Sequence, residues 1–332
     1  MQLQSFKEYF TALSDNGKEL IIKELINIFE SNSDIKEEGE LLHTCCPHCK
    51  SQKIRGNGFS VKGVQKYFCT DCKKNFSDAT GQVWCWIKKK DEMKTYIHGL
   101  LCGYSIRRCA KECGISINTS FIWRHKLLSS FSEMSSEQYK GILEVDELFF
   151  RVSEKGNRKM TRPARKRGKI TKAGISDEQV AVIATADRVG NKGFKVATRG
   201  RITKANVAEV LDGKIEKVEV LCSDNHVSYS AYSRDHQMTH KTIMASHNQR
   251  VTEKIYHVQN VNNMDKRLRD FLRPRNGVAS KYLQNYLNWF LVMEKIKNQV
   301  NRYKSIVGII FASANALEVF KQISDSHILL RT

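Results

Sequence analysis

Two Cys-x-x-Cys pairs, separated by nineteen residues, constrain this 332-residue chain more than any other feature. The pairs are Cys46 with Cys49 and Cys69 with Cys72, and each places two thiolates on one side of a tight turn. Two such turns complete a tetrahedral shell of sulfur ligands around zinc and leave no coordination position open. The spacing therefore predicts a structural zinc ribbon. Three neighbouring residues are spare ligands, namely His43, Cys45 and His48.

The other five of the ten cysteines do not suggest a disulfide framework. The chain begins MQLQSFKEYF, which lacks the basic segment and apolar run of a secretory signal, so we expect a cytoplasmic protein. In a reducing compartment isolated cysteines are small apolar residues, and we expect them to be buried. They are Cys85, Cys102, Cys109, Cys113 and Cys222.

Charge predicts the class of partner. Lysine and arginine number 55 against 35 acids, which gives a net charge of +20. Residues 1–44 hold nine acids and four bases, so the remainder carries about +25. A strongly basic chain favours a polyanion, and nucleic acid is the default because neutralising its phosphates releases counterions. Improved solubility is the alternative explanation.

No membrane span is predicted. The longest apolar stretch, residues 306–320, contains Gly308, Ser313, Asn315 and Glu318. It also falls short of the ~20 residues that a spanning helix needs.

Helical patterns flank the ribbon. Residues 1–40 have apolar side chains at helical spacing, and residues 41–80 hold the ribbon, whose segment 50–75 carries seven bases and one acid. Residues 90–130 have the layout of a helix-turn-helix, in which Ala110 permits a close crossing, Gly114 forms the turn and Ser116 caps the second helix. A plain helical scaffold is the alternative. The side chains expected in a DNA groove are Asn118, Thr119 and Arg124.

From residue 140 onward the pattern changes to strands. Residues 141–150, 179–186, 194–197 and 218–224 are predicted strands, and residues 204–211 are a predicted helix. This succession indicates an α/β fold, a mixed sheet with flanking helices. Asp146 and Asp224 come from separate strands and are expected at one edge, although a solvated strand acid and an Asx turn are the simpler explanations for each alone.

Two further segments complete the chain. Residues 151–175 hold ten bases and one acid, which suggests a basic loop able to follow a phosphate backbone, or merely a solvated arm. Residues 278–300 and 305–324 are predicted helices that cover the core. Within the first of them, Trp289 is expected to pack in the core rather than stack on DNA.

The ordered motifs carry a resemblance to a known family. The ribbon and helix-turn-helix are followed by LEVDELFF, VLCSDNHVSYS, HVQNVNNMDKRLRDFL and NGVASKYLQNYLNWF. This order, over residues 40 to 295, resembles bacterial insertion-sequence transposases with an Asp-Asp-Asn core of the DDE type. The resemblance implies an RNase H-like core at residues 140–302, followed by a helical extension at 303–332.

The resemblance also implies the site. Matched position by position, Asp146, Asp224 and Asn262 are the catalytic residues and the ligands of two catalytic Mg²⁺ or Mn²⁺ ions. Arg269 is also counted as catalytic: it occupies a position that usually holds a basic residue, and it grips a phosphate beside the metals. An amide is a weaker ligand for a hard cation than a carboxylate, and Asp265, one helical turn after Asn262, is a candidate for the missing charge.

Three residues near these positions are further candidates for the site. Glu144 and Glu147 flank the first acid, and strand alternation points Glu147 to the other face of the sheet. His257 contacts the scissile phosphate, or it is an ordinary capping or packing histidine.

The resulting hypothesis is a DNA transposase that binds terminal inverted repeats and target double-stranded DNA, and cuts and joins strands as a homo-oligomer on DNA. Two alternatives stay open. One is a zinc-dependent DNA-binding regulator with a non-catalytic remnant of the core, and the other is a nuclease that cleaves without joining.

Overall fold

The computed structural model describes residues 14, 45–60, 64–77, 80–85, 87–132, 138–157, 160, 174–243, 251–313 and 316–325. The chain divides into two units, Met1–Asp78 and Ala79–Thr332. Apart from Ser14, the predicted helical region 1–40 lies outside the described residues, as does most of the basic stretch 151–175.

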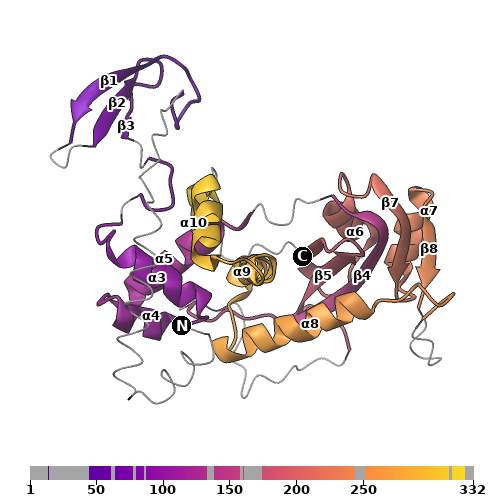
Figure 1. Ribbon diagram of the computed structural model, residues 1–332. Helices are drawn as coiled ribbons and strands as arrows, with labels where there is room; N and C mark the ends of the chain where they lie inside the picture. Colours follow the sequence, from indigo (N-terminus) through magenta and orange to yellow (C-terminus); the bar gives the residue numbers. More distant parts are fainter. Residues whose placement is uncertain are drawn as a thin grey trace, which may run out of the picture. The chain divides into compact units, whose positions relative to one another are not determined.

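The first unit contains the ribbon. Its three strands, β1 (Ile54–Phe59), β2 (Gln65–Cys69) and β3 (Asn75–Ser77), form an antiparallel sheet in that order (Figure 1). Among the described residues of this unit the buried core is small: it consists of Cys46, Cys69 and Phe76, with Tyr67 stacked on Phe76 at 5.4 Å between ring centroids. So few buried side chains supply little hydrophobic stabilisation, and a unit of this kind depends on a staple.

The second unit begins with three short helices, α3 (Glu92–Leu101), α4 (Ile106–Glu112) and α5 (Ile117–Ser129). The predicted turn and cap are confirmed. Gly114 has a φ of +55°, which favours glycine, and the Ser116 hydroxyl accepts a hydrogen bond from the backbone N–H of Thr119 at the start of α5.

A five-stranded mixed sheet follows, with strand order β6-β5-β4-β7-β8. Its strands are β4 (Lys140–Arg151), β5 (Gln179–Asp187), β6 (Lys192–Arg199), β7 (Lys217–Ser223) and β8 (Thr239–Thr242). The first three pair antiparallel, whereas β4 with β7 and β7 with β8 pair parallel. This is the RNase H-like arrangement, and the predicted strands and mixed sheet are confirmed.

Helices cover both faces of the sheet (Figure 1). On one face, α6 (Lys204–Leu211) and α7 (Val227–Asp235) pack against Leu143 and Val145 of β4. On the other, α8 (Gln259–Leu272) and α9 (Leu283–Ile296) pack against Leu148. Successive side chains of β4 therefore alternate between two cores, as the period of a strand requires.

The C-terminal helices differ from the predicted ones. Helix α9 begins later than residue 278, because Asn276 and Gly277 have left-handed φ values of 50° and 82° and Ala279 is extended. Two short 3₁₀ turns, η4 (Arg273–Arg275) and η5 (Ser280–Tyr282), precede it. The predicted helix 305–324 is two helices, α10 (Arg302–Ala312) and α11 (Ala316–Asp325). Trp289 is fully buried, so its predicted packing role is confirmed.

Among the described residues, no single helix has the length and apolar character to cross a membrane. Helices α10 and α11 meet those criteria only as a pair, bent by 76°. Both contribute buried side chains, Ile306, Ile310 and Ala316, to the core formed by α3, α5 and α9.

Candidate metal centre and catalytic site

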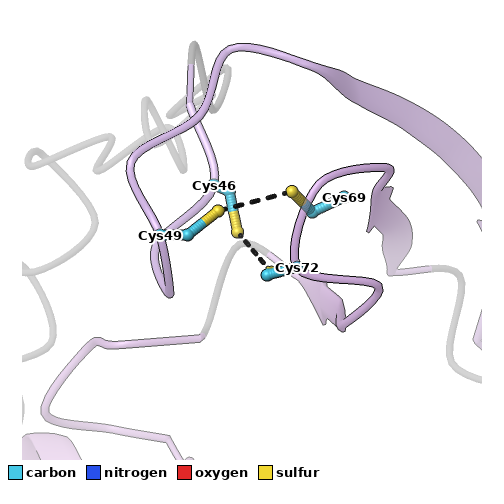
Figure 2. Close-up of side chains that lie close together, drawn as sticks. All are labelled: Cys46, Cys49, Cys69 and Cys72. Atoms are coloured by element: carbon cyan, nitrogen blue, oxygen red, sulfur yellow. Dashed lines mark hydrogen bonds between the residues drawn. The ribbon is translucent and has the colours of Figure 1, made fainter.

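The four predicted zinc ligands converge in the first unit (Figure 2). The Sγ atoms of Cys46, Cys49, Cys69 and Cys72 all lie within 4.8 Å of one another. Cys46 approaches Cys72 at 3.6 Å and Cys49 approaches Cys69 at 3.5 Å, and all four are free thiols. Tetrahedral Zn–S bonds of ~2.3 Å place sulfur atoms ~3.8 Å apart, so the donor set fits zinc. Of the spare ligands, His43 is outside the described residues, and Cys45 and His48 are described but do not join this group.

The two knuckles repeat one backbone design. The N–H of Cys46 donates to the carbonyl of Ser51 at 2.7 Å, and the N–H of Cys69 donates to the carbonyl of Lys74 at 3.1 Å, five residues on in each case. The residue after each second cysteine is left-handed, with a φ of 63° at Lys50 and 55° at Lys73. The repeated turn aims both pairs of sulfurs at one point.

The thiols crowd one another in a way that a cation would relieve. Backbone hydrogen bonds, led by the N–H of Cys72, lower the pKa of Cys69 to about 7. Desolvation raises the pKa of Cys72 to about 12. Four neighbouring thiolates repel one another, and a divalent cation removes that repulsion while it takes up their lone pairs.

The second cluster lies in the sheet, where β7 ends beside β4. The last pair of the parallel register is Glu144 with Cys222, so two residues further along Asp146 stands next to Asp224, just past the end of β7. One carboxylate oxygen each from Asp146, Glu147 and Asp224 lies within 4.8 Å of the others. Asp224 also forms the expected Asx turn, because its Oδ1 accepts from the backbone N–H of His226 at 3.1 Å.

Glu147 reaches this cluster from the opposite face of the sheet. Its carboxylate accepts a hydrogen bond from the hydroxyl of Tyr229 on α7 at 3.0 Å, which confirms the predicted alternation. Because β7 ends at Ser223 while β4 continues to Arg151, no strand separates the two faces at this point, and side chains from both meet beside Asp224. Strand alternation alone gave no reason to include Glu147 in the site.

Burial acts on the charge of these groups. It raises the pKa of Asp146 to about 6 and the pKa of Glu147 to about 7, and the charge of Asp224 adds to both shifts. Oxygen ligands of this kind suit Mg²⁺ or Mn²⁺, and a bound cation would favour the ionised carboxylates. The donor set therefore fits the divalent metal that the family resemblance implies.

Glu144 fixes helix α8 against β4. Its fully buried carboxylate accepts hydrogen bonds from the backbone N–H groups of Asn260 and Val261 at 2.8 and 3.2 Å, in the first turn of α8. Arg188 balances its charge at 3.1 Å, and the ring of His257 lies 3.4 Å away. An acid at a helix N-terminus satisfies free N–H groups and complements the helix dipole. His257 lies just before the N-cap residue Val258, and its Nδ1 accepts a hydrogen bond from the backbone N–H of Gln259 at 3.2 Å, in keeping with the capping alternative among its predicted roles.

Helix α8 brings three polar side chains toward this side of the sheet. Asn262, Asp265 and Arg269 share one helical face, because they are three, four and seven residues apart. Asn262 is exposed, and Asp265 is buried. Burial raises the pKa of Asp265 to about 8, and the nearby charge of Asp146 adds to the shift. The positive charge of Arg269 lowers the pKa of both Asp146 and Asp265, so the arginine lies near both.

A cleft of about 850 Å³ includes Arg269 in its wall. Its lining holds Arg151, Lys155 and Arg273 over an apolar floor that includes Phe150 and Leu272. The loop after β4 meets the Asn-Gly-Val segment here, because Lys155 Nζ donates to the carbonyls of Asn276 and Gly277, both at 3.1 Å. The left-handed conformation of these two residues explains why the motif has Asn followed by Gly.

Two expectations from the sequence are wrong. Arg124 is 1% exposed and does not face a groove, because its Nη2 donates to the carbonyl of Tyr104 at 2.8 Å and its guanidinium lies 4.9 Å from the ring of Trp289. Cys102 is exposed and Cys85 is half-buried, although Cys109, Cys113 and Cys222 are buried as expected. Asn118 is exposed and Thr119 is half-buried near the start of α5.

The sheet has the strand order and directions of the RNase H-like class, with Asp146 in the middle of β4 and Asp224 just past the end of the adjacent parallel strand β7. Residues 138–294 match the ISXO2-like transposase domain. The chain is also 23% identical, over 256 residues, to an uncharacterized protein in transposable element ISH50 of Halobacterium salinarum, covering 76% of this chain and 85% of that one. Residues 138–294 are therefore similar to the transposase domains of insertion sequences, and the curated relative comes from a transposable element.

Two solved structures show weaker likeness. The pre-cleavage Mos1 transpososome is 8% identical with a TM-score of 0.26, covering 70% of this chain and 79% of that chain. The Drosophila P element transposase strand transfer complex is 11% identical with a TM-score of 0.27, covering 70% and 63%. Scores this low do not establish a shared fold, so the fold assignment rests on strand order and direction.

Proposed function

We propose that the protein binds the terminal inverted repeats of an insertion sequence and then cleaves and joins DNA strands with Mg²⁺ or Mn²⁺. One observation supports this more than any other: the carboxylates of Asp146, Glu147 and Asp224 converge within 4.8 Å inside a transposase domain. In the family pattern Asp146, Asp224 and Asn262 hold the metal.

Bound divalent metal would supply Lewis acidity that stabilises charge on the entering and leaving oxygens of the phosphodiester. The chain's own residues then orient the substrate. Arg269 is permanently charged, lies near Asp146 and lines the basic cleft, so it binds a phosphate oxygen beside the reacting bond. Water attacks first, and the freed 3′-hydroxyl attacks in the second step, so no serine or cysteine nucleophile is required.

DNA recognition is assigned to the basic ribbon and to α4 and α5. Residues 50–75 carry seven bases and one acid, which favours contact with phosphates. The exposed Asn118 near the start of α5 is placed to read base edges if α5 enters the major groove. Two element ends have to be held together, and we propose a homo-oligomer on DNA in the cytoplasm.

The test is a nicking assay with the full-length, zinc-loaded protein and a duplex that carries the element's end. Asp146→Asn is expected to lower the Mg²⁺-dependent nicking rate at least ~10³-fold, because several kcal/mol of transition-state stabilisation is lost. The matched control is Asp235→Asn on α7, an exposed acid paired with Lys204, which should nick like the wild type. Unchanged nicking by Asp146→Asn rejects the catalytic assignment.

Asn262 is the observation that favours a second candidate, the DNA-binding regulator. A neutral, exposed amide stands where a catalytic core of this family often has glutamate. If the protein is a regulator, Asp146→Asn and Asp235→Asn should both still bind the element's end, and even the wild type should not nick it. The nuclease alternative is separated by a joining assay with pre-cut ends, in which a transposase produces joined strands and a nuclease does not.

A further inference from the structure

Asp265 is a buried acid whose local environment does not account for it. It is 8% exposed, and its Oδ1 has no hydrogen-bond partner among the described residues. A buried carboxylate oxygen without a partner is costly, and native proteins seldom retain one unless a ligand or ion completes it. The fold has placed this side chain on the face of α8 that also carries Asn262 and Arg269.

The position of α8 is fixed, which makes the placement of Asp265 specific. Glu144 of β4 binds the first turn of α8, and Asp146 lies two residues further along the same face of β4. In α8, Asp265 lies four residues after Val261, which is bonded to Glu144. Starting from the contact of Glu144 with Val261, two residues along the strand lead to Asp146 and one turn along the helix leads to Asp265, and the charge of Asp146 acts on Asp265.

We infer that Asp265, rather than Asn262, supplies the carboxylate that α8 contributes to the divalent-cation site at Asp146. This rests on the proposed function, and it identifies which side chain of α8 serves that site. The unpartnered, buried oxygen of Asp265 lies close enough to Asp146 to feel its charge, and it adds a hard oxygen donor for a cation there, whereas an exposed amide offers one neutral oxygen. The negative charge that the family pattern loses at Asn262 is restored one turn later on the same helix face.

The experiment measures Mn²⁺ binding to the full-length, zinc-loaded protein by calorimetry. It also measures thermal unfolding with and without Mn²⁺ in a buffer that contains no other free divalent cation. Asp265→Asn is expected to weaken Mn²⁺ binding at least ~10-fold and to reduce the Mn²⁺-induced rise in Tm. Asp265→Glu keeps the carboxylate and should retain more affinity than Asp265→Asn. The control is Asp270→Asn, an exposed acid of α8 that pairs with Arg273, which should bind Mn²⁺ like the wild type.

Asn262→Ala provides the decisive comparison, because it should weaken Mn²⁺ binding less than Asp265→Asn does. The reverse order, or wild-type affinity in Asp265→Asn, overturns the inference. Loss of a buried, unpartnered acid should not lower Tm in the absence of Mn²⁺, so that melt separates ligand loss from misfolding.

Asp146→Asn distinguishes this failure from failure of the proposed function. If it abolishes Mn²⁺ binding while Asp265→Asn does not, only the part assigned to Asp265 is wrong. If Asp146→Asn binds Mn²⁺ like the wild type, the metal centre itself is wrong.

Discussion

The ribbon and the carboxylate site both gather ligands for a metal, but they do so over different distances in the sequence. Each half of the ribbon site comes from a turn of four residues, and the two turns are joined by one hairpin. The carboxylate site joins β4 to the end of β7, with Asp146 and Asp224 separated by 78 residues, and α8 stands a further 38 residues on at Asn262.

This difference determines what holds each site in place. In the ribbon, local backbone hydrogen bonds aim the sulfurs, and few side chains are buried around them. The carboxylates stand on a sheet that is packed on both faces. Glu144 binds the first turn of α8, and the hydroxyl of Tyr229 on α7 binds the carboxylate of Glu147, so contacts between residues far apart in the chain hold the site. The ribbon should therefore depend on its metal for folding, whereas the second unit should fold without one and use metal for chemistry.

The largest expected effect breaks the ribbon alone. Cys69→Ser removes one of four zinc ligands, and structural zinc contributes roughly 10–16 kcal/mol of apparent binding free energy to small domains at neutral pH. We expect loss of bound zinc and of the dispersed amide resonances of residues 45–77 in NMR spectra.

The control is Cys45→Ser, next to a ligand but not among the four sulfurs that converge, and it should keep both. All four tryptophans lie in Ala79–Thr332, so tryptophan fluorescence reports on the second unit only. Its melting temperature should be the same in both variants. A large decrease in Cys69→Ser would show that the second unit also depends on the zinc.

A smaller effect is expected at the carboxylates. Glu147→Gln keeps an acceptor for Tyr229 but removes a charge from the cluster, and we expect Mn²⁺ affinity to fall about 10–100-fold while the fold persists. Burial, followed by Asp224, raises the pKa of Glu147 to about 7, so protons compete with the cation. Affinity should rise as pH increases toward 7 in the wild type, and less steeply in the variant.

Calorimetry at several pH values measures this, with Glu209→Gln, an exposed acid of α6, as the control. Equal Mn²⁺ affinity in Glu147→Gln and Glu209→Gln would mean that Glu147 lies near the site without serving it.

What the sequence could predict follows the same division. Spacing was sufficient for the four cysteines, and an apolar run was sufficient for β5 and for α6, whose bounds match the predicted helix 204–211. Local pattern also placed the side chain of Glu147 on the correct face. These features depend on residues close together in the chain.

The rest depends on partners far away in the chain. Arg124 has the polarity of a groove residue, but Trp289 covers it from a helix that begins more than 150 residues later. Glu144 holds α8 through Asn260, which lies 116 residues further on in the chain, and Glu147 joins the site because β7 ends beside it. None of these contacts leaves a periodic signal in one sequence.

Acid should destabilise the two regions for different reasons. His125 of α5 is 2% exposed and stacks on Tyr282 at 3.8 Å, and burial, followed by the charge of Arg124, lowers its pKa to about 3. Between about pH 6.5 and 3 the unfolded chain binds a proton here that the folded chain does not, so stability falls as pH falls. The slope from one proton is ~1.4 kcal/mol per pH unit.

Urea unfolding followed by tryptophan fluorescence tests this in the second unit. His125→Phe keeps a ring for Tyr282 and should show a shallower loss of stability below pH 6.5 than the wild type. The ribbon loses stability in acid through its thiols, because zinc binding requires their deprotonation, and this loss should be the same in both proteins. Parallel pH profiles for the two proteins in the fluorescence assay would contradict the assignment to His125.

The smallest expected effect compares two tyrosines of α7, one that supports the fold alone and one that also supports the carboxylate site. Tyr229 and Tyr232 of α7 are both fully buried, and each hydroxyl donates to a carboxylate, Tyr229 to Glu147 at 3.0 Å and Tyr232 to Asp212 at 2.8 Å. Replacing either with phenylalanine removes one hydrogen bond, so each should cost about 1 kcal/mol of unfolding free energy. Only Tyr229→Phe releases a carboxylate of the cluster, so only this variant should weaken Mn²⁺ binding. The decrease should be smaller than the ~10-fold that is the least expected for Glu147→Gln. If the two variants bind Mn²⁺ equally well, the hydroxyl of Tyr229 supports the fold and not the site, and the carboxylates are held by the sheet alone.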